Sequence, residues 1–129
     1  MNKIKKLRKF FNSFMIDGYI VPKNDEYFNE YINESSDRLK FISNFSGSAG
    51  LGMILKNRNY LFVDGRYTIQ AQIQSGKNFK VVTMPQKFPK DMLNKKKKIK
   101  IGFDPKLHSE KQLNFLFNIK NIILKPINR

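Results

Sequence analysis

The sequence predicts an α/β protein with a six-stranded mixed sheet flanked by helices. Three observations predict this class. Six short runs rich in β-branched and aromatic residues are spread along the chain, and segments with apolar residues three and four apart lie before, between and after them. One pair of runs has a connection of hairpin length, whereas the later pairs need crossovers. The 129 residues fit one domain spanning 1–129.

The composition excludes several classes of protein. Cys is absent, which excludes disulfides and thiolate sites and agrees with a cytoplasmic location. No apolar stretch approaches the roughly 20 residues that span a bilayer, so no membrane partner is expected. The net charge of +15 suggests a polyanion, but 20 of the 25 basic residues are Lys rather than the bidentate Arg that nucleic-acid recognition favours. Nucleic acid is therefore not the expected partner.

The first third of the chain predicts a helix, a strand and a second helix. Residues 2–16 form an amphipathic pattern that ends before Gly18, and its apolar stripe consists of Ile4, Leu7, Phe11, Phe14 and Met15. A surface helix packed on the sheet is favoured over a helix bound to anionic lipid. Residues 18–22 predict a buried strand, 24–32 a helical turn, and 36–43 a short helix that carries Leu39, Phe41 and Ile42.

The middle of the chain predicts a hairpin followed by a strand–helix–strand unit. Residues 50–55 and 60–64 favour β structure and are separated by the polar segment K-N-R-N. Residues 67–74 are good helix formers, with Ile69 and Ile73 four apart and Gly76 in the position of a C-terminal cap. Residues 79–84 predict the next strand.

The last third predicts two more strands around a helix. Residues 91–93 allow a brief helical turn, the run of Lys95–Lys98 is typical of a solvated approach to a strand, and 99–104 alternate as a strand should. Residues 109–117 fit a capping box formed by Ser109 and Gln112, and the inward face of this helix is Leu113, Leu116 and Phe117. Residues 121–126 predict the sixth strand.

Few residues offer catalytic chemistry. The sole histidine, His108, precedes a helix, and a surface or capping role is expected for it. No set of metal ligands is apparent, so no metal site is predicted. The segment S-G-S-A-G-L-G has the glycine density of a phosphate loop, but Gly47, Gly50 and Gly52 have the wrong order and precede a strand. A tight turn into the hairpin is the better interpretation.

The strongest candidate site is the corner Asp64-Gly65-Arg66, at the end of a predicted strand. In a purely local interpretation, Asp64 caps the following helix, Gly65 supplies an unusual backbone conformation and Arg66 pairs with a nearby carboxylate. In a functional interpretation, the corner points Arg66 toward a carboxylate or phosphate ligand. The residues by themselves favour the two interpretations about equally.

Four segments resemble the N-terminal domain of Xaa-Pro aminopeptidases, the aminopeptidase P group related to creatinase and prolidase. They are DGYIVPKNDEYFNEYI, DRLKFISNFSGSAGLGMI, LFVDGRYTIQAQ and IGFDP. The pairing of F-S-G-S-A-G at 45–50 with D-G-R-Y at 64–67 is the most specific feature. The resemblance implies a ribonuclease-H-like creatinase N-terminal domain, which agrees with the predicted sheet.

The resemblance also implies a function. Full-length relatives remove the N-terminal residue from peptides whose second residue is proline, with a dinuclear metal centre, usually manganese, in a C-terminal pita-bread domain. This chain lacks that domain, so it is expected to hold no cofactor and to be inactive alone. The expected partners are its own C-terminal catalytic domain, neighbouring subunits and the peptide substrate. The alternative is a stand-alone binding or assembly module that uses its basic surface on an anion such as RNA.

Motif positions carry the family's site onto this chain. Arg66 and Tyr67 are expected to face substrate, with Phe45 as an apolar wall. The residues expected to support the corner are Asp64, Gly65, Ser46, Gly47, Ser48 and Gly50. The family usually has Asp where this chain has Ser46, so no charge role is expected at that position.

Overall fold

A six-stranded mixed sheet forms the centre of the computed structural model, which describes residues 2–23, 38–47, 50–84, 86–93, 97–108, 110–117 and 121–127. The strand order is β4-β3-β2-β1-β5-β6. The strands are β1 (Gly18–Pro22), β2 (Leu51–Leu55), β3 (Asn59–Asp64), β4 (Lys80–Met84), β5 (Ile99–Phe103) and β6 (Ile122–Pro126). The predicted α/β class and all six predicted strands are confirmed.

The sheet contains both antiparallel and parallel pairs. β1 pairs antiparallel with β2, and β2 pairs antiparallel with β3 through the predicted hairpin, whose turn is closed by a 2.8 Å bond from Leu55 N–H to the Arg58 carbonyl. β4, β5 and β6 each follow a helical crossover and join their neighbours in parallel. The sheet is therefore antiparallel around β2 and parallel toward both of its edges.

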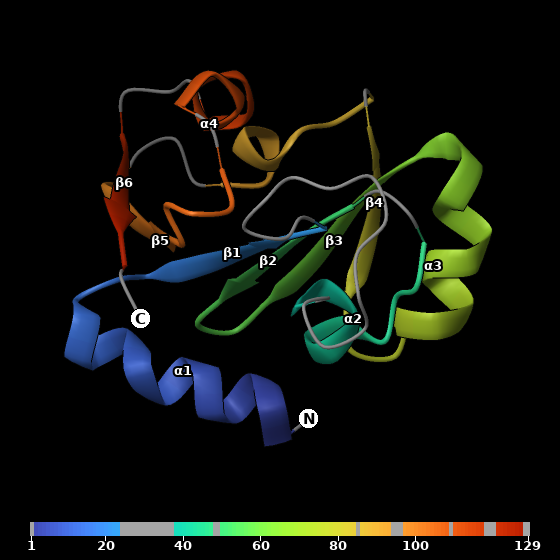
Figure 1. Cartoon of the computed structure of the whole chain (residues 1–129), viewed down its shortest axis with the longest axis horizontal. Helices are drawn as coiled ribbons and strands as arrows, with labels where there is room; N and C mark the ends of the chain where they lie inside the picture. The colour runs from blue at the N-terminus through green and yellow to red at the C-terminus, as the bar shows by residue number, and fades with distance from the viewer. Residues whose placement is uncertain are drawn as a thin grey trace.

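Helices cover both faces of the sheet (Figure 1). The helical segments are α1 (Asn2–Phe14), α2 (Arg38–Ser43), η2 (Gly65–Tyr67), α3 (Thr68–Ser75), η3 (Pro89–Met92) and α4 (Glu110–Phe117). Two hydrophobic cores result, one beneath α1, α2 and α3 and the other beneath η3 and α4. In β3, Leu61 and Val63 enter the first core while Tyr60 and Phe62 enter the second, as the two-residue period of a strand requires.

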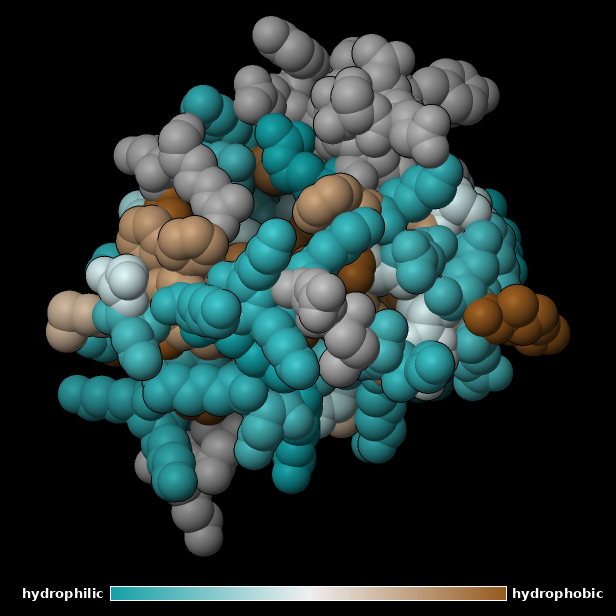
Figure 2. All heavy atoms as spheres, turned by 90° about the horizontal axis from the view of Figure 1, so that it is seen from below, coloured by the Kyte–Doolittle hydropathy of each residue, from teal (hydrophilic) through white to brown (hydrophobic). Residues whose placement is uncertain are grey.

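The inward faces of the helices are mostly as predicted. Ile4 and Phe11 of α1 are buried, and the predicted face of α4, Leu113, Leu116 and Phe117, is buried as well. In α3 the sheet side carries Ala71 and Ser75, whereas Ile69 and Ile73 are 74% and 80% exposed. Figure 2 shows the α1 side of the molecule, where hydrophilic side chains predominate and hydrophobic ones protrude at the edge where α3 lies.

The end of α1 differs from the prediction. The helix stops at Phe14, and Met15, which was predicted to extend the apolar stripe, is 66% exposed with a φ of 56°. A 2.9 Å bond from Ile16 N–H to the Phe11 carbonyl closes this left-handed cap. Gly18 does not end the helix; it lies inside β1, where an added Cβ would approach Leu55 Cδ2 to 2.5 Å.

His108 also differs from the prediction, because it is a buried residue rather than a surface or capping one. The residue is 7% exposed, and neither ring nitrogen has a hydrogen-bond partner among the described residues. The ring packs edge-on against Phe103 with 6.0 Å between centroids. Burial lowers the pKa of His108 to about 4, although Asp104 acts in the opposite direction. The imidazole is therefore neutral at pH 7.

Some predictions lie outside the described residues. They are the helical turn at 24–32, the cap Ser109, the corner residue Ser48 and part of the Lys run at 95–98. The predicted turn at 91–93 is confirmed as part of η3.

Candidate functional site: the corner after strand β3

The candidate site begins where β3 leaves the sheet. β3 lies between β2 and β4, and its last residue, Asp64, is paired with Met84 of β4. Asp64 is in an extended conformation and caps η2, since its Oδ1 accepts a 2.8 Å bond from the Arg66 N–H. The capping role predicted for Asp64 is thus confirmed, and it explains why an acidic residue ends this strand.

Arg66 turns back onto the carboxylate that caps its own helix. Its Nη2 donates to Asp64 Oδ2 at 2.9 Å and its Nε lies 3.3 Å from each carboxylate oxygen. The guanidinium is nevertheless 77% exposed, so the pair lies in solvent. The guanidinium is oriented by Asp64 and remains open to a ligand on its other edge.

The electrostatics keep both groups charged. The hydrogen bonds from Arg66 lower the pKa of Asp64, and the same contact raises the pKa of Arg66. Neither group therefore gains or loses a proton near neutral pH. The corner is suited to binding and orienting a ligand rather than to acid–base catalysis.

Gly65 does not supply the unusual backbone conformation that was predicted for it. Among the described glycines none has a positive φ, and an added Cβ at Gly65 would meet no atom within 4 Å. Its position in the exposed η2 turn is compatible with other small residues, so the corner does not depend on the conformational freedom of glycine here.

Tyr67 connects the corner to the core. Its ring packs edge-on against Phe45 at 6.0 Å between centroids, and the Arg66 guanidinium carbon lies 5.4 Å from the Tyr67 centroid. Phe45 is 0% exposed, which corrects its prediction as a substrate-facing wall. A fully buried ring cannot contact a ligand, and the role of Phe45 is to support Tyr67 from below.

The glycines of the preceding loop fit closely around Phe45. A Cβ at Gly47 would lie 2.2 Å from Phe45 Cζ, and a Cβ at Gly50 would lie 3.0 Å from Phe45 Cε2. A Cβ cannot approach another carbon as closely as at Gly47, so the loop needs glycine there to pass over the ring, whereas the contact at Gly50 is tight and would require the ring to shift slightly. These two glycines support the corner through packing and not through anion binding.

Ser46 ties the loop to α3 through two glutamines that were not predicted from the sequence. Its N–H donates to Gln74 Oε1 at 2.9 Å, and its Oγ accepts from Gln74 Nε2 at 2.8 Å and from Gln70 Nε2 at 3.2 Å. The signal available in the sequence was the spacing of Gln70 and Gln74, four apart on the helix that follows the corner. The neutral Ser46 is matched to neutral amides, in agreement with the expectation that no charge acts there.

The described residues show neither a cluster of metal ligands nor a membrane-spanning helix. They contain no group of three or more His, Cys, Asp or Glu side chains that could hold a metal ion. Within the same residues, none of the helices has the length and apolarity needed to cross a membrane.

Comparison with known proteins identifies the corner's context. The model of the creatinase/prolidase N-terminal domain matches residues 3–122, which include strands β1 to β5 and the corner. The chain belongs to this family. The match of this creatinase/prolidase N-terminal domain includes the motif pair at 45–50 and 64–67 that carried the resemblance.

Curated relatives of this creatinase/prolidase N-terminal domain are peptidases by name. The chain is 35% identical over 115 residues to a probable Xaa-Pro aminopeptidase P of Coprinopsis cinerea, and 36% identical over 113 residues to Xaa-Pro aminopeptidase 1 of Dictyostelium discoideum. Each match covers 84% of this chain. The chain spans only 18% of the length of each of these relatives.

Solved structures have the same fold. An X-prolyl aminopeptidase from Caenorhabditis elegans, described as a cytosolic enzyme with a di-nuclear active site, matches 99% of this chain and 24% of its own, with a TM-score of 0.80 and 25% identity. The isolated N-terminal domain of a putative metallopeptidase from Corynebacterium diphtheriae matches with a TM-score of 0.78 at 19% identity, over 99% and 95% of the two chains. None of these comparisons supports the RNA-binding alternative.

Proposed function

We propose that this chain is the non-catalytic N-terminal domain of a cytoplasmic Xaa-Pro aminopeptidase, in which it shapes the substrate entrance and contributes to subunit assembly. The observation that carries the proposal is the family match over residues 3–122 together with relatives named Xaa-Pro aminopeptidase. Its partners in this role are the catalytic domain of the same protein, neighbouring subunits and a peptide with proline in second position.

In this proposal, catalysis belongs to another domain because of the side chains that this domain contains. Hydrolysis by a dinuclear centre requires several carboxylate and imidazole ligands around two metal ions. The described residues do not fit such a centre, because no cluster of three or more ligands is formed and the sole histidine is buried away from solvent. We therefore assign the metal, expected to be manganese, to the catalytic domain.

The corner supplies an oriented cation for the peptide. Arg66 is exposed and charged, and Asp64 holds its guanidinium in one orientation. A planar guanidinium pairs well with a peptide carboxylate or carbonyl, and Tyr67 adds an aromatic surface beside it. In this proposal Arg66 and Tyr67 border the path of the substrate, and the Phe45 loop holds them in place.

The first test concerns the chain alone. Incubated with manganese and a peptide that has proline in second position, the 129-residue chain should release no N-terminal residue. Release that a chelator abolishes would show that the chain carries its own metal centre, and the assignment of catalysis to another domain would be wrong.

The second test concerns Arg66 in the protein that includes the catalytic domain. Arg66→Ala should lower kcat/KM for the peptide by about tenfold, the worth of one hydrogen bond to a charged group, and leave metal content unchanged. Arg58→Ala is the matched control, because Arg58 is an exposed arginine in the β2–β3 turn. If the two variants had equal kcat/KM, Arg66 would be only the ion-pair partner of Asp64 and would have no role in binding the peptide.

A further inference from the structure

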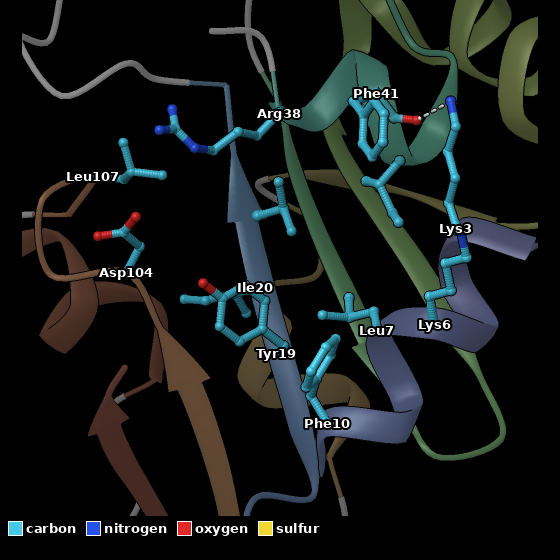
Figure 3. A pocket seen from close by; sticks show the side chains of 12 residues that line it. Lys3, Lys6, Leu7, Phe10, Tyr19, Ile20, Arg38, Phe41, Asp104 and Leu107 are labelled. Carbon is cyan, nitrogen blue, oxygen red and sulfur yellow. Dashed lines mark hydrogen bonds between the residues drawn. The ribbon is translucent and has the colours of Figure 1, made fainter. Parts of the chain in front are cut away.

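A pocket that is separate from the corner lies between α1, α2, β1 and the segment after β5 (Figure 3). Its volume is about 440 Å³, within the range of roughly 300–1,000 Å³ that small-molecule sites occupy. None of Asp64, Arg66 and Tyr67 lines it. A ligand in this pocket would therefore bind whether or not the corner has its proposed function.

The floor of the pocket is apolar. Val21 of β1 is 7% exposed, and the partly buried side chains of Leu7, Tyr19 and Ile42 complete the floor. These four side chains belong to the first hydrophobic core, so the floor is formed by the packing of α1 and α2 on the sheet. An apolar body placed there gains free energy from the surface that it removes from water.

Two phenylalanines stand at the rim. Phe10 and Phe41 are 48% and 63% exposed, although both line the pocket. Lys3 holds the second of them in place, because its Nζ donates to the Phe41 carbonyl at 2.9 Å and lies 4.1 Å from the ring centroid. The exposed aromatic surface at the rim extends the apolar floor toward solvent and provides further contact area for a ligand.

The charge at the pocket favours an anion. Among the described lining residues, three side chains are cationic, Lys3, Lys6 and Arg38, and one is anionic, Asp104. Figure 3 places the two lysines on the α1 side and Asp104 on the opposite side. Within the part of the chain that the structure describes, the exposed Lys6 ammonium has no ion-pair or hydrogen-bond partner. A ligand head group can therefore pair with Lys6 without displacing a protein contact.

We propose that this pocket binds a small amphiphilic anion, with an apolar chain or ring over Leu7, Tyr19 and Val21 and one carboxylate or phosphate at Lys6. The apolar floor selects the body of the ligand, and the excess of positive charge on the α1 side selects its head group. A neutral or cationic ligand of the same shape meets the same floor but not the same charge.

The binding test uses the 129-residue chain and simple probes. Decanoate and octyl phosphate, each below its micelle concentration, should produce saturable NMR shifts confined to the pocket, at residues such as Tyr19 and Leu107. Decylammonium, which has the same chain and the opposite charge, should bind at least about tenfold more weakly. The anion that binds more tightly shows whether the pocket prefers a carboxylate or a phosphate head group.

A pair of neighbouring lysines provides the matched variants. Lys6→Gln should weaken binding of the anions by about threefold, the worth of one exposed ion pair, and Lys5→Gln should leave it unchanged. Both side chains are exposed on α1, but only Lys6 lines the pocket. Three results would overturn the proposal: no saturable binding of either anion, equal binding of decylammonium, or equal loss in the Lys5 and Lys6 variants, which would indicate attraction to the net charge alone.

Discussion

At the scale of single residues, Gly47 and Gly65 belong to the same corner but differ in what a methyl group would meet. At Gly47 the methyl would overlap the fully buried Phe45 ring, whereas at Gly65 it would enter open space. Gly47→Ala should therefore lower the free energy of unfolding by about 1–3 kcal/mol, the usual cost of overpacking. Urea denaturation of the two variants measures the difference.

Gly65→Ala is the control for that experiment. It should be neutral or stabilise the protein by about 0.5 kcal/mol, because alanine restricts the unfolded chain and the native backbone at Gly65 accepts it. If both variants lost the same stability, the close fit of the loop around Phe45 would not be the reason for glycine at position 47.

His108 makes stability depend on pH. The unfolded chain binds a proton on this imidazole below a pKa of 6.5, whereas the folded protein does so only below about 4. The stability contributed by the neutral ring is complete above pH 6.5 and is lost progressively as the pH falls toward 4. Between pH 7 and pH 5 the free energy of unfolding should fall by about 2 kcal/mol from this residue.

His108→Phe tests that assignment, because phenylalanine keeps an aromatic ring against Phe103 and has no proton to gain. The variant should lose most of the pH dependence between pH 7 and pH 5, measured by urea denaturation at each pH. An unchanged slope would place the titrating group elsewhere. The range stops at pH 5, above the pKa values of ordinary carboxyl groups, so that the comparison isolates the imidazole.

At the scale of elements, α1 is held by polar contacts as well as by its apolar stripe. Arg8 is half-buried and donates to the Leu55 carbonyl at 2.8 Å and to Asn59 Oδ1 at 2.7 Å, which docks the helix on both strands of the β2–β3 hairpin. In the sequence, Arg8 is one of several basic residues among the apolar positions of this helix, and nothing distinguishes it from the neighbouring lysines. Its function in docking depends on where the hairpin lies.

The C-terminal cap of α1 offers a stabilising change. Met15 has a left-handed backbone conformation that costs a non-glycine residue about 1 kcal/mol, and its side chain is exposed and contributes little burial. Met15→Gly should therefore raise the free energy of unfolding by about 1 kcal/mol and raise the Tm measured by circular dichroism.

The cap of α2 provides the comparison. Asn44 has a φ of 65° in the equivalent position, with its N–H bonded to the Lys40 carbonyl at 2.8 Å. Asn tolerates this conformation better than Met, so Asn44→Gly should have a smaller effect than Met15→Gly. A larger gain at Asn44 would contradict the explanation by backbone strain.

At the scale of the whole molecule, the net charge of +15 destabilises the folded state, because like charges repel one another more strongly in the compact chain. Raising the salt concentration from about 0.01 M to about 0.15 M shortens the Debye length from about 30 Å to about 8 Å and screens the repulsion between lysines. The Tm should rise over this range. Reversing two exposed charges of α1, with Lys5→Glu and Lys9→Glu, should raise the Tm at low salt and reduce its salt dependence.

A Tm that is independent of salt would mean that local ion pairs, and not the overall charge, control the electrostatic contribution to stability. Such pairs exist in the described residues, for example between Lys56 and Asp17 at 3.4 Å. The double variant separates the two effects, because neither Lys5 nor Lys9 takes part in the ion pairs seen on the hairpin side.

The sequence by itself determined the α/β class, the six strands and the family. These depend on features that are local along the chain: apolar residues at a period of two or near 3.6, short polar turns, and the motif pair at 45–50 and 64–67. The cap formed by Asp64 was also predictable, because donor and acceptor are two residues apart.

The tertiary structure alone decided which aromatic and polar residues are buried. Phe45, predicted to face substrate, and His108, predicted at the surface, are both buried. The tie from Ser46 to Gln74 spans 28 positions, and the pocket combines α1, α2, β1 and the end of β5. Periodicity describes one element at a time, whereas burial depends on how elements pack together, so these features appear only in the folded chain.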